Sequence, residues 1–297
     1  MNSQQSTIDH QLIETHAHLD YPDFANDFED VLHRATEAGV TRIITIGTSV
    51  ESSQRAVELA EKYPNIFAVI GVHPTYVNEA GDDVITPLRE LAKNPRVVAL
   101  GETGLDYHYL PSVEAAKRKD VQVFNALQSA TEEQLEATIE DGAFKSRQAD
   151  LFQEQLDLAV ELGLNVVIHQ RDAWDDTLEL MEPYAGKLRG VFHCFGGTLE
   201  QAKEMIDLGH LVSFTGIVTF KNGKDVREVA RRIPIDKFMV ETDCPYLAPV
   251  PFRGKRCEPA YTRLVAEEIA KARGIRLEEI ASATTATAGE FFRFNRG

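Results

Sequence analysis

The sequence has few cysteines and no long apolar run, and both shortages limit what this protein can be. Its three cysteines, Cys194, Cys244 and Cys257, form no CxxC pair. Their number and spacing fit free thiols in a reducing compartment better than a disulfide framework. No apolar run approaches the roughly 20 residues that span a bilayer, and the N-terminus lacks a basic region followed by an apolar core. We therefore expect a cytoplasmic protein that does not enter a membrane.

Positive charge is also scarce. The chain of 297 residues has 31 Lys and Arg against 47 Asp and Glu, so its formal net charge is −16. This balance disfavours broad electrostatic binding of nucleic acid, although it allows a local basic patch beside a pocket. With 43% hydrophobic and 26% charged residues, the composition is that of a globular protein with a sizeable core. Nothing in the sequence indicates an obligate protein partner.

A GxGxxG motif is missing after the first predicted strand, which disfavours a dinucleotide-binding fold. Short β-branched runs instead alternate with helical patterns along the chain. Eight such runs occur, at 12–13, 42–47, 66–72, 97–100, 165–168, 190–192, 211–214 and 238–240. Eight strand–helix units, in a chain near the roughly 250 residues typical of the fold, predict an α/β protein with a (β/α)8 TIM barrel. Because no Pro-, Gly- or Ser-rich linker divides the chain, residues 1–297 should form a single domain.

The helical patterns include one departure from this repeat. Helices are expected at 25–38, 51–62, 82–93, 148–162, 172–182, 198–208, 224–232, 260–273 and 277–292. The connection after the fourth strand, residues 112–147, is unusually long. Thr131 with Gln134 matches a capping box and Asp141-Gly142 a helix stop, which together predict an inserted helical hairpin. It should project from the catalytic face, either as a partial lid or as an oligomer contact or inert decoration.

Histidines and carboxylates gather at the ends of the predicted strands. They follow six of the eight strands and are His16, His18, His73, Glu102, His169, His193 and Asp243. In a (β/α)8 barrel such positions line the C-terminal mouth, where active sites lie. A lone His-x-His pair would more often be a surface or turn feature, but the coincidence over six strands favours a divalent metal site. Imidazole and carboxylate ligands suit Zn, Mn or Fe, with Mg or Mn where oxygen ligands dominate.

Residues adjoining these candidates are expected to have supporting roles. Glu241, one strand alternation before Asp243, should lie behind the ligands. Cys194 and Cys244 should pack as small apolar residues. Arg171 and Asp172 should form a structural pair behind His169.

Seven stretches together carry a resemblance to a known family. They are THAHLD, IGVHP, ALGETGLDYH, VIHQRDA, VFHCFGGT, TGIVTFKN and VETDCPYLAPVPFRGKRCEPAYT. With these stretches the chain resembles the TatD-type metal-dependent deoxyribonucleases of the amidohydrolase superfamily. The resemblance extends from the first strand to the helix at 260–273 and leaves out 112–147.

The resemblance implies two divalent metal ions per chain, of Mg, Mn or Zn. His16 and His18 would hold one ion with Asp243, His169 and His193 would hold the other, and Glu102 would bridge both. Two such ions would lower the pKa of a shared water and clamp the attacking and leaving oxygens of a phosphodiester. Glu102 and Asp243 are therefore the catalytic candidates, with Asp243 as general base. His73 would reach a substrate phosphate oxygen.

A basic loop lies just beyond the eighth predicted strand. The stretch 251–259, PFRGKRCEP, contains Arg253, Lys255 and Arg256. Such a run is usually a solvated loop, but its place at the mouth of an acidic protein favours phosphate binding. Lys221 is a weaker candidate for the same role.

These observations predict a metal-dependent nuclease that removes nucleotides from single-stranded DNA ends. One alternative keeps the site and changes the bond, as in an esterase or amidohydrolase that removes a mischarged aminoacyl group from tRNA. Another is a barrel without chemistry that serves as a binding module, which the intact ligand set disfavours. The ligand set is compatible with several divalent ions, and the same site could act on DNA or RNA.

Overall fold

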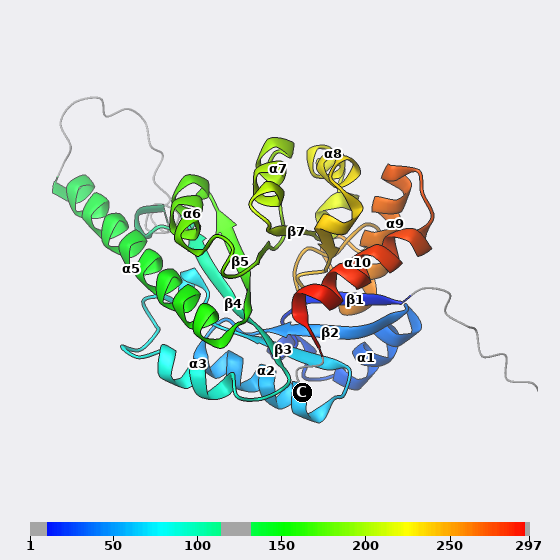
Figure 1. The fold of residues 1–297 in the computed structure, drawn as a ribbon, viewed down its shortest axis with the longest axis horizontal. Helices are drawn as coiled ribbons and strands as arrows, with labels where there is room; N and C mark the ends of the chain where they lie inside the picture. Colours follow the sequence, from blue (N-terminus) through cyan, green and yellow to red (C-terminus); the bar gives the residue numbers. More distant parts are fainter. Residues whose placement is uncertain (1–10, 114–131, 295–297) are drawn as a thin grey trace, which may run out of the picture.

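Eight parallel strands form one sheet whose spatial order follows the chain (Figure 1). The structure, a computed structural model, describes residues 11–113 and 132–294. The strands are β1 (Leu12–Ala17), β2 (Val40–Ile46), β3 (Ile66–Ile70), β4 (Val97–Asp106), β5 (Asn165–Arg171), β6 (Gly190–Phe192), β7 (Leu211–Phe214) and β8 (Phe238–Val240). A parallel bridge between Ala17 and Cys244 places the end of β1 beside the chain that leaves β8. The predicted (β/α)8 barrel is thereby confirmed.

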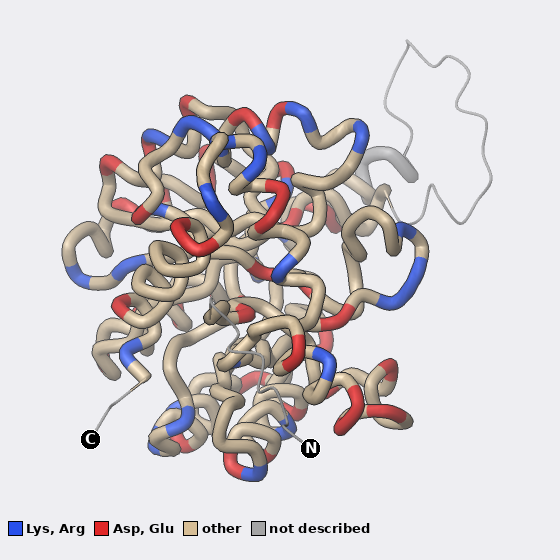
Figure 2. Tube along the Cα trace, turned by 90° about the vertical axis from the view of Figure 1, so that its right-hand side faces the viewer, with Lys and Arg blue, Asp and Glu red and all other residues tan. Residues whose placement is uncertain are grey.

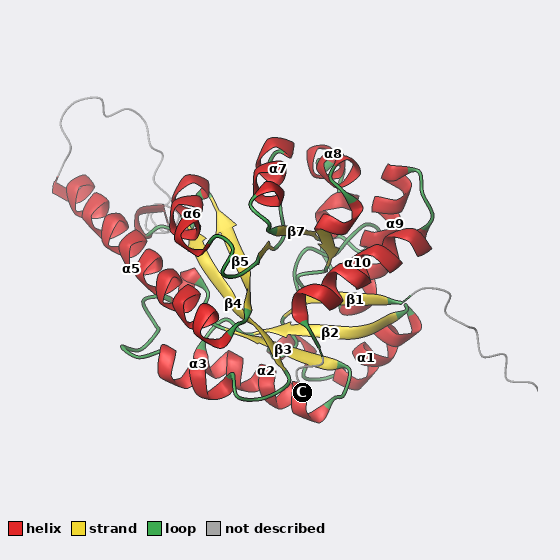
Figure 3. Ribbon diagram, viewed as in Figure 1, coloured by secondary structure: helices red, strands yellow, loops and turns green. Residues whose placement is uncertain are grey.

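Helices surround the strands (Figure 3). They are α1 (Phe28–Glu37), α2 (Val50–Lys62), α3 (Ile85–Leu91), α5 (Glu132–Leu162), α6 (Trp174–Met181), α7 (Leu199–Asp207), α8 (Lys224–Arg232), α9 (Thr262–Arg273) and α10 (Leu277–Phe292). In α2, for example, Ala56, Val57 and Ala60 are buried on one face, as expected for a helix packed on a sheet. No helix in residues 11–113 and 132–294 is long and apolar enough to cross a membrane.

Alternating side chains of each strand point into and out of the barrel. In β2, Ile44 and Ile46 belong to an inner cluster, whereas Ile43 packs in the larger cluster that includes the helices. Phe291 and Phe292 at the end of α10 join the inner cluster. This end of α10 lies where the strands begin, because the Asn165 side chain, on the first residue of β5, donates to the Phe291 carbonyl at 2.7 Å. The opposite end of the barrel is left for polar side chains.

Three strands extend further at their C-terminal ends than the sequence predicts. β1, β4 and β5 continue through His16, Glu102 and His169, which were expected to follow them. Apolar patterning ends early in these strands because their last residues face the barrel mouth instead of the core. The pairing of β4 with β5 shifts register between Leu100 and Thr103, on either side of Glu102.

The predicted helix stop at Asp141-Gly142 is wrong, because α5 runs unbroken from Glu132 to Leu162. Asp141 accepts hydrogen bonds from the backbone and hydroxyl of Ser112, so it links the helix to the preceding chain. Gly142 is not among the glycines with positive φ, the usual conformation of a terminating glycine. The 31 residues of α5 span about 46 Å, and the helix protrudes from the barrel (Figure 1). The rest of the predicted hairpin and lid, at 114–131, lies outside the described residues.

The phenylalanines at the end of α10, which fill the barrel where the strands begin, should be a main source of stability. Phe292 is fully buried, so Phe292→Ala should lower the free energy of unfolding by about 3–5 kcal/mol through lost burial and a cavity. Urea denaturation followed by circular dichroism measures this loss. The control Leu208→Ala, at a half-exposed position, should change stability by less than about 0.5 kcal/mol. Equal stability of the two variants would contradict this account of the barrel end.

Candidate metal centre

All seven predicted strand-end residues meet at the mouth of the barrel. Six of them line a cleft of about 1030 Å³. His16, the seventh, is fully buried beneath it. The strand-end pattern therefore places these side chains together, as the (β/α)8 prediction requires.

The carboxylate of Glu102 lies at the centre of the group and is 3% exposed. Its Oε1 is 2.7 Å from His193 Nε2 and 2.9 Å from His169 Nδ1. Its Oε2 is 3.4 Å from His16 Nε2 and 3.8 Å from His18 Nε2. The two oxygens of one carboxylate thus face different imidazoles, since Oε1 lies beside His193 and His169 and Oε2 beside His16 and His18.

Asp243 completes the side of the site that His16 and His18 form. Its Oδ1 lies 3.4 Å from His18 Nε2 and 3.8 Å from His16 Nε2. Asp243 has φ of 60°, a left-handed conformation that Asp tolerates better than most residues, and its backbone N–H donates to the His16 carbonyl at 2.9 Å. The turn after β8 therefore positions the Asp243 carboxylate beside the end of β1.

The donor set fits divalent metal. Both ring nitrogens of His16 are buried without a hydrogen-bond partner among the described residues. Buried polar atoms are normally satisfied, and these lie beside two carboxylates. Ligand atoms of His16, His18 and Asp243 lie within 4.8 Å of one another, as do those of His16, Glu102 and His193. An ion beside Glu102 and Asp243 would give His16 Nε2 the partner that it lacks.

Hydrogen bonds on the far side of two rings fix which nitrogen faces the centre. Nδ1 of His18 donates to the Ile46 carbonyl at 3.0 Å. Nε2 of His169 donates to Oδ2 of Asp106 at 2.9 Å. In each neutral ring the other nitrogen keeps its lone pair and points at Glu102, the orientation that metal-binding histidines require.

His73 has the opposite arrangement. The backbone N–H of Thr75 donates to His73 Nδ1 at 3.2 Å, so the proton of the neutral ring sits on Nε2. That nitrogen lies 3.4 Å from Glu102 Oε1. His73 therefore presents an N–H donor to the site, which suits contact with an oxygen better than with a metal.

Burial and neighbouring charge oppose each other at the centre. Burial raises the pKa of Glu102, but the imidazoles of His193, His73 and His16 outweigh it and hold that pKa well below its usual range. Burial lowers the pKa of His193, but Glu102 and then Glu241 raise it well above its usual range. Glu102 is consequently ionised at neutral pH and available as a ligand.

Asp106 is a site residue that the sequence analysis did not identify. It is 1% exposed and is the carboxylate that holds His169. The signal was its even spacing from Glu102, which places both side chains on one face of β4. Between them, Gly104 has φ of 136°, and a Cβ there would lie 2.0 Å from the His169 carbonyl oxygen. Glycine is required at this position for β4 to approach β5.

The neighbours of the ligands differ in part from expectation. Glu241 lies behind the centre as predicted, since its Oε1 accepts from the Cys194 backbone at 2.7 Å and is 3.7 Å from His193 Nδ1. Cys194 lines the cleft, with Sγ 3.6 Å from the Thr215 hydroxyl. Cys244 is fully buried in the hydrophobic core, as predicted.

The predicted pairing of Arg171 with Asp172 is wrong. Asp172 has φ of 56° and its carboxylate instead pairs with His108 Nδ1 at 3.0 Å. Arg171 lines the cleft and donates to the Tyr109 hydroxyl at 3.2 Å. The backbone turn at Asp172 sends the two side chains to different partners.

The basic side chains predicted to bind phosphate do not line the cleft. Arg256 binds the carboxylate of Asp27 through two contacts of 2.7 Å. The guanidinium of Arg253 lies 3.7 Å from the centroid of the Phe220 ring. Among the described cleft-lining residues, Arg171 is the one Lys or Arg. The lining of the cleft does not include Arg253, Lys255, Arg256 or Lys221.

A parallel barrel with imidazoles and carboxylates converging at its mouth defines a class of protein, the metal-dependent hydrolases. The family model "TatD related DNase" matches residues 13–293. The chain therefore belongs to the TatD family of metal-dependent hydrolases, and the resemblance noted from the sequence is confirmed.

Individual relatives match over nearly the whole chain. The uncharacterized metal-dependent hydrolase YabD of Bacillus subtilis (strain 168) is 38% identical over 285 residues, covering 96% of this chain and 100% of YabD. The 3'-5' ssDNA/RNA exonuclease TatD of Pantoea vagans (strain C9-1) is 35% identical over 277 residues, covering 91% and 95%. The crystal structure of YJJV, a TatD homolog from Escherichia coli K12, has a TM-score of 0.79 at 28% identity, covering 96% and 99%.

Asp106 should act as a positioning residue for His169. Asp106→Asn removes the charge that orients the ring, and it should weaken metal binding by about 10–100-fold. Titration of Mn²⁺ followed by calorimetry measures the effect. The control Asp176→Asn changes a carboxylate that accepts from Tyr107 and does not line the cleft. Unchanged affinity in Asp106→Asn would show that His169 does not need this partner.

Proposed function

We propose that this TatD-family hydrolase cleaves phosphodiester bonds at the ends of single-stranded DNA, using two divalent metal ions of Mg, Mn or Zn. The observation that carries the proposal is the position of the Glu102 carboxylate, whose Oε1 lies beside His169 and His193 and whose Oε2 lies beside His16 and His18. His16, His18 and Asp243 would hold one ion, His169 and His193 the other, and Glu102 would contact both. When bound, the ions would lower the pKa of a water and balance the charge that develops on phosphate.

The remaining steps fall to side chains of the chain itself. Asp243, at the cleft and 15% exposed, can accept the proton of the attacking water. His73 can donate its Nε2 proton to a phosphate oxygen of the substrate, in keeping with the hydrogen bond from Thr75 to its other nitrogen. Asp106 and Glu241 keep the rings of His169 and His193 in place.

The rim of the cleft supports an unpaired nucleic acid as the substrate. Of the Phe, Trp and Tyr side chains in the described residues, those that are exposed are Tyr76, Tyr109 and Tyr246, and all three line this cleft. Exposed aromatic rings are stacking platforms for single-stranded bases. The 3'-5' ssDNA/RNA exonuclease of Pantoea vagans, a relative, is named for activity on such substrates.

Charge on the protein favours short rather than extended contact with the substrate. Lys and Arg are interspersed with Asp and Glu over the trace in Figure 2, and the net charge is −16. Arg171 in the cleft is the nearest candidate for a phosphate contact. We infer that Arg253, Lys255, Arg256 and Lys221 would meet only a strand that extends beyond the cleft.

A cytoplasmic location stays a prediction.

Cleavage of a labelled single-stranded oligonucleotide with Mg²⁺ or Mn²⁺ tests the function. Wild type should shorten the strand from its ends. Asp243→Asn should reduce kcat by about 10²–10⁴-fold through loss of the general base, and Glu102→Ala should lose activity as well. Asp176→Asn serves as the control with wild-type activity. Full cleavage by Glu102→Ala would contradict the proposal, and turnover of aminoacyl-tRNA without cleavage of the oligonucleotide would favour an ester hydrolase instead.

The assignment of the first ion is tested by removing both of its histidines. In the double variant His16→Ala/His18→Ala, metal titration should show one bound equivalent where wild type binds two, because the His169–His193 side keeps its ligands. Elemental analysis after gel filtration gives the stoichiometry. Two retained equivalents would refute the assignment.

A further inference from the structure

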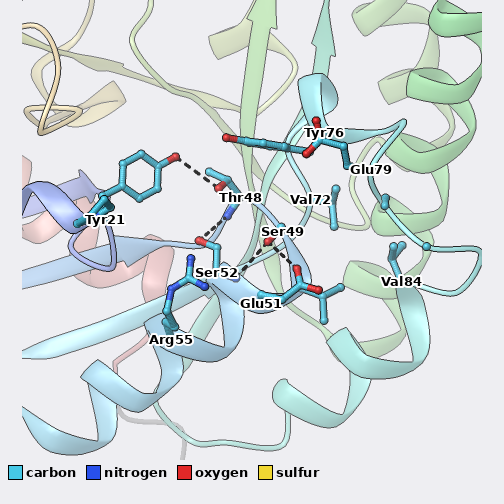
Figure 4. A pocket seen from close by; sticks show the side chains of 14 residues that line it. Tyr21, Thr48, Ser49, Glu51, Ser52, Arg55, Val72, Tyr76, Glu79 and Val84 are labelled. Carbon is cyan, nitrogen blue, oxygen red and sulfur yellow. Dashed lines mark hydrogen bonds between the residues drawn. The ribbon is translucent and has the colours of Figure 1, made fainter.

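A side cavity of about 480 Å³ opens next to the catalytic cleft. The two spaces share three lining residues, Tyr21, Thr48 and Tyr76. In Figure 4 the side chains of Tyr21 and Tyr76 point toward one another above Thr48. The hydroxyl of Tyr21 lies 3.4 Å from that of Thr48. The side cavity is therefore continuous with the cleft through the gap between two tyrosines.

Both tyrosines pack against residues of the catalytic centre. The ring of Tyr21 stacks on His18, with centroids 4.9 Å apart and an interplanar angle of 18°. The ring of Tyr76 meets His73 edge-on, with centroids 6.4 Å apart. A group held between the tyrosines thus lies one ring away from the candidate ligands. Such a group would belong to the part of the substrate next to the reacting bond.

The charges in the side cavity disfavour phosphate. Glu51 and Glu79 line it, and the Glu51 carboxylate accepts a hydrogen bond from the Ser49 hydroxyl (Figure 4). The one cation among its described lining residues, Arg55, is neutralised by the fully buried side chain of Asp20 at 2.9 Å. A second phosphate would meet net negative charge here. Carboxylates do accept hydrogen bonds from amino and hydroxyl groups.

The other walls suit a flat, largely apolar group. Val72 and Val84 line one side, and the hydroxyls of Ser49 and Ser52 at the start of α2 line another. The volume lies within the range of pockets that take small organic molecules. A nucleobase with its sugar combines the aromatic face, hydrogen-bond donors and neutrality that these walls select.

We propose that the side cavity binds the nucleoside next to the scissile phosphate, with its base between Tyr21 and Tyr76. The inference rests on the proposed nuclease function, because the reacting phosphate must occupy the metal centre for the neighbouring nucleoside to reach this cavity. It assigns Tyr21 and Tyr76 to contacts with the base and gives the enzyme a site that binds the nucleoside separately from the phosphate.

The test uses 2′-deoxyadenosine, a probe without phosphate and therefore without a charge to draw it to the metals. Gly81 lines the cavity, and a Cβ there would meet no atom within 4 Å, so Gly81→Phe can fill the space without a backbone clash. Gly289 in α10, at the other end of the barrel, is equally open and provides the control Gly289→Phe. Calorimetric titration of the metal-loaded proteins should show nucleoside binding weakened about tenfold or more in Gly81→Phe and unchanged in Gly289→Phe.

A second variant guards against a folding defect in the first. Tyr76→Leu removes one flanking ring and should weaken nucleoside binding by about tenfold. Binding that is equal in wild type and Gly81→Phe, or absent from wild type, would overturn the proposal. If wild type binds the nucleoside but does not cleave oligonucleotides, the proposed function fails and the nucleoside site stands.

Discussion

The structure depends on one buried negative charge, the carboxylate of Glu102. An ionised carboxylate with so little exposure is very costly unless it is surrounded by compensating groups. Five imidazole nitrogens lie within 3.8 Å of its two oxygens, and their histidines lie on β1 and β5 or follow β1, β3 and β6. No segment of local sequence can supply such a shell. Only a closed barrel brings these strand ends around a single point.

The contacts that close the barrel therefore also position the residues of the site. The bridge between Ala17 and Cys244 joins β1 to the chain after β8, and the adjoining hydrogen bond from Asp243 to the His16 carbonyl places two ligand residues side by side. At the other end, the phenylalanines of α10 fill the barrel with apolar side chains. One end is a packed core and the other a polar centre, so a substrate can enter only at the mouth.

Much of this could be predicted from the sequence because the strand–helix repeat is regular. A histidine one to three residues beyond a β-branched run must lie at the mouth if the runs form a parallel barrel, and this placed His16, His73 and His193 correctly. Asp106 was missed because β4 continues past its apolar part, and the glycine that allows this, Gly104, resembled a loop residue. The length of a strand at the mouth is set by its neighbours and not by its own hydrophobicity.

Long-range partners limited the prediction elsewhere. Whether Arg256 faces substrate or Asp27 depends on a carboxylate more than 200 positions away, which no local pattern reveals. Asp141-Gly142 has the composition of a helix stop, yet the Asp141 side chain binds Ser112 and the helix continues. In both cases a tertiary contact overrode a local preference.

We propose that Glu102 would contact two metal ions at once. Anomalous diffraction from crystals grown with Mn²⁺ tests it directly. Two peaks are expected beside the carboxylate, one next to His16, His18 and Asp243 and the other next to His169 and His193. A single peak, or a pair of peaks that leaves Glu102 on one side, would contradict it.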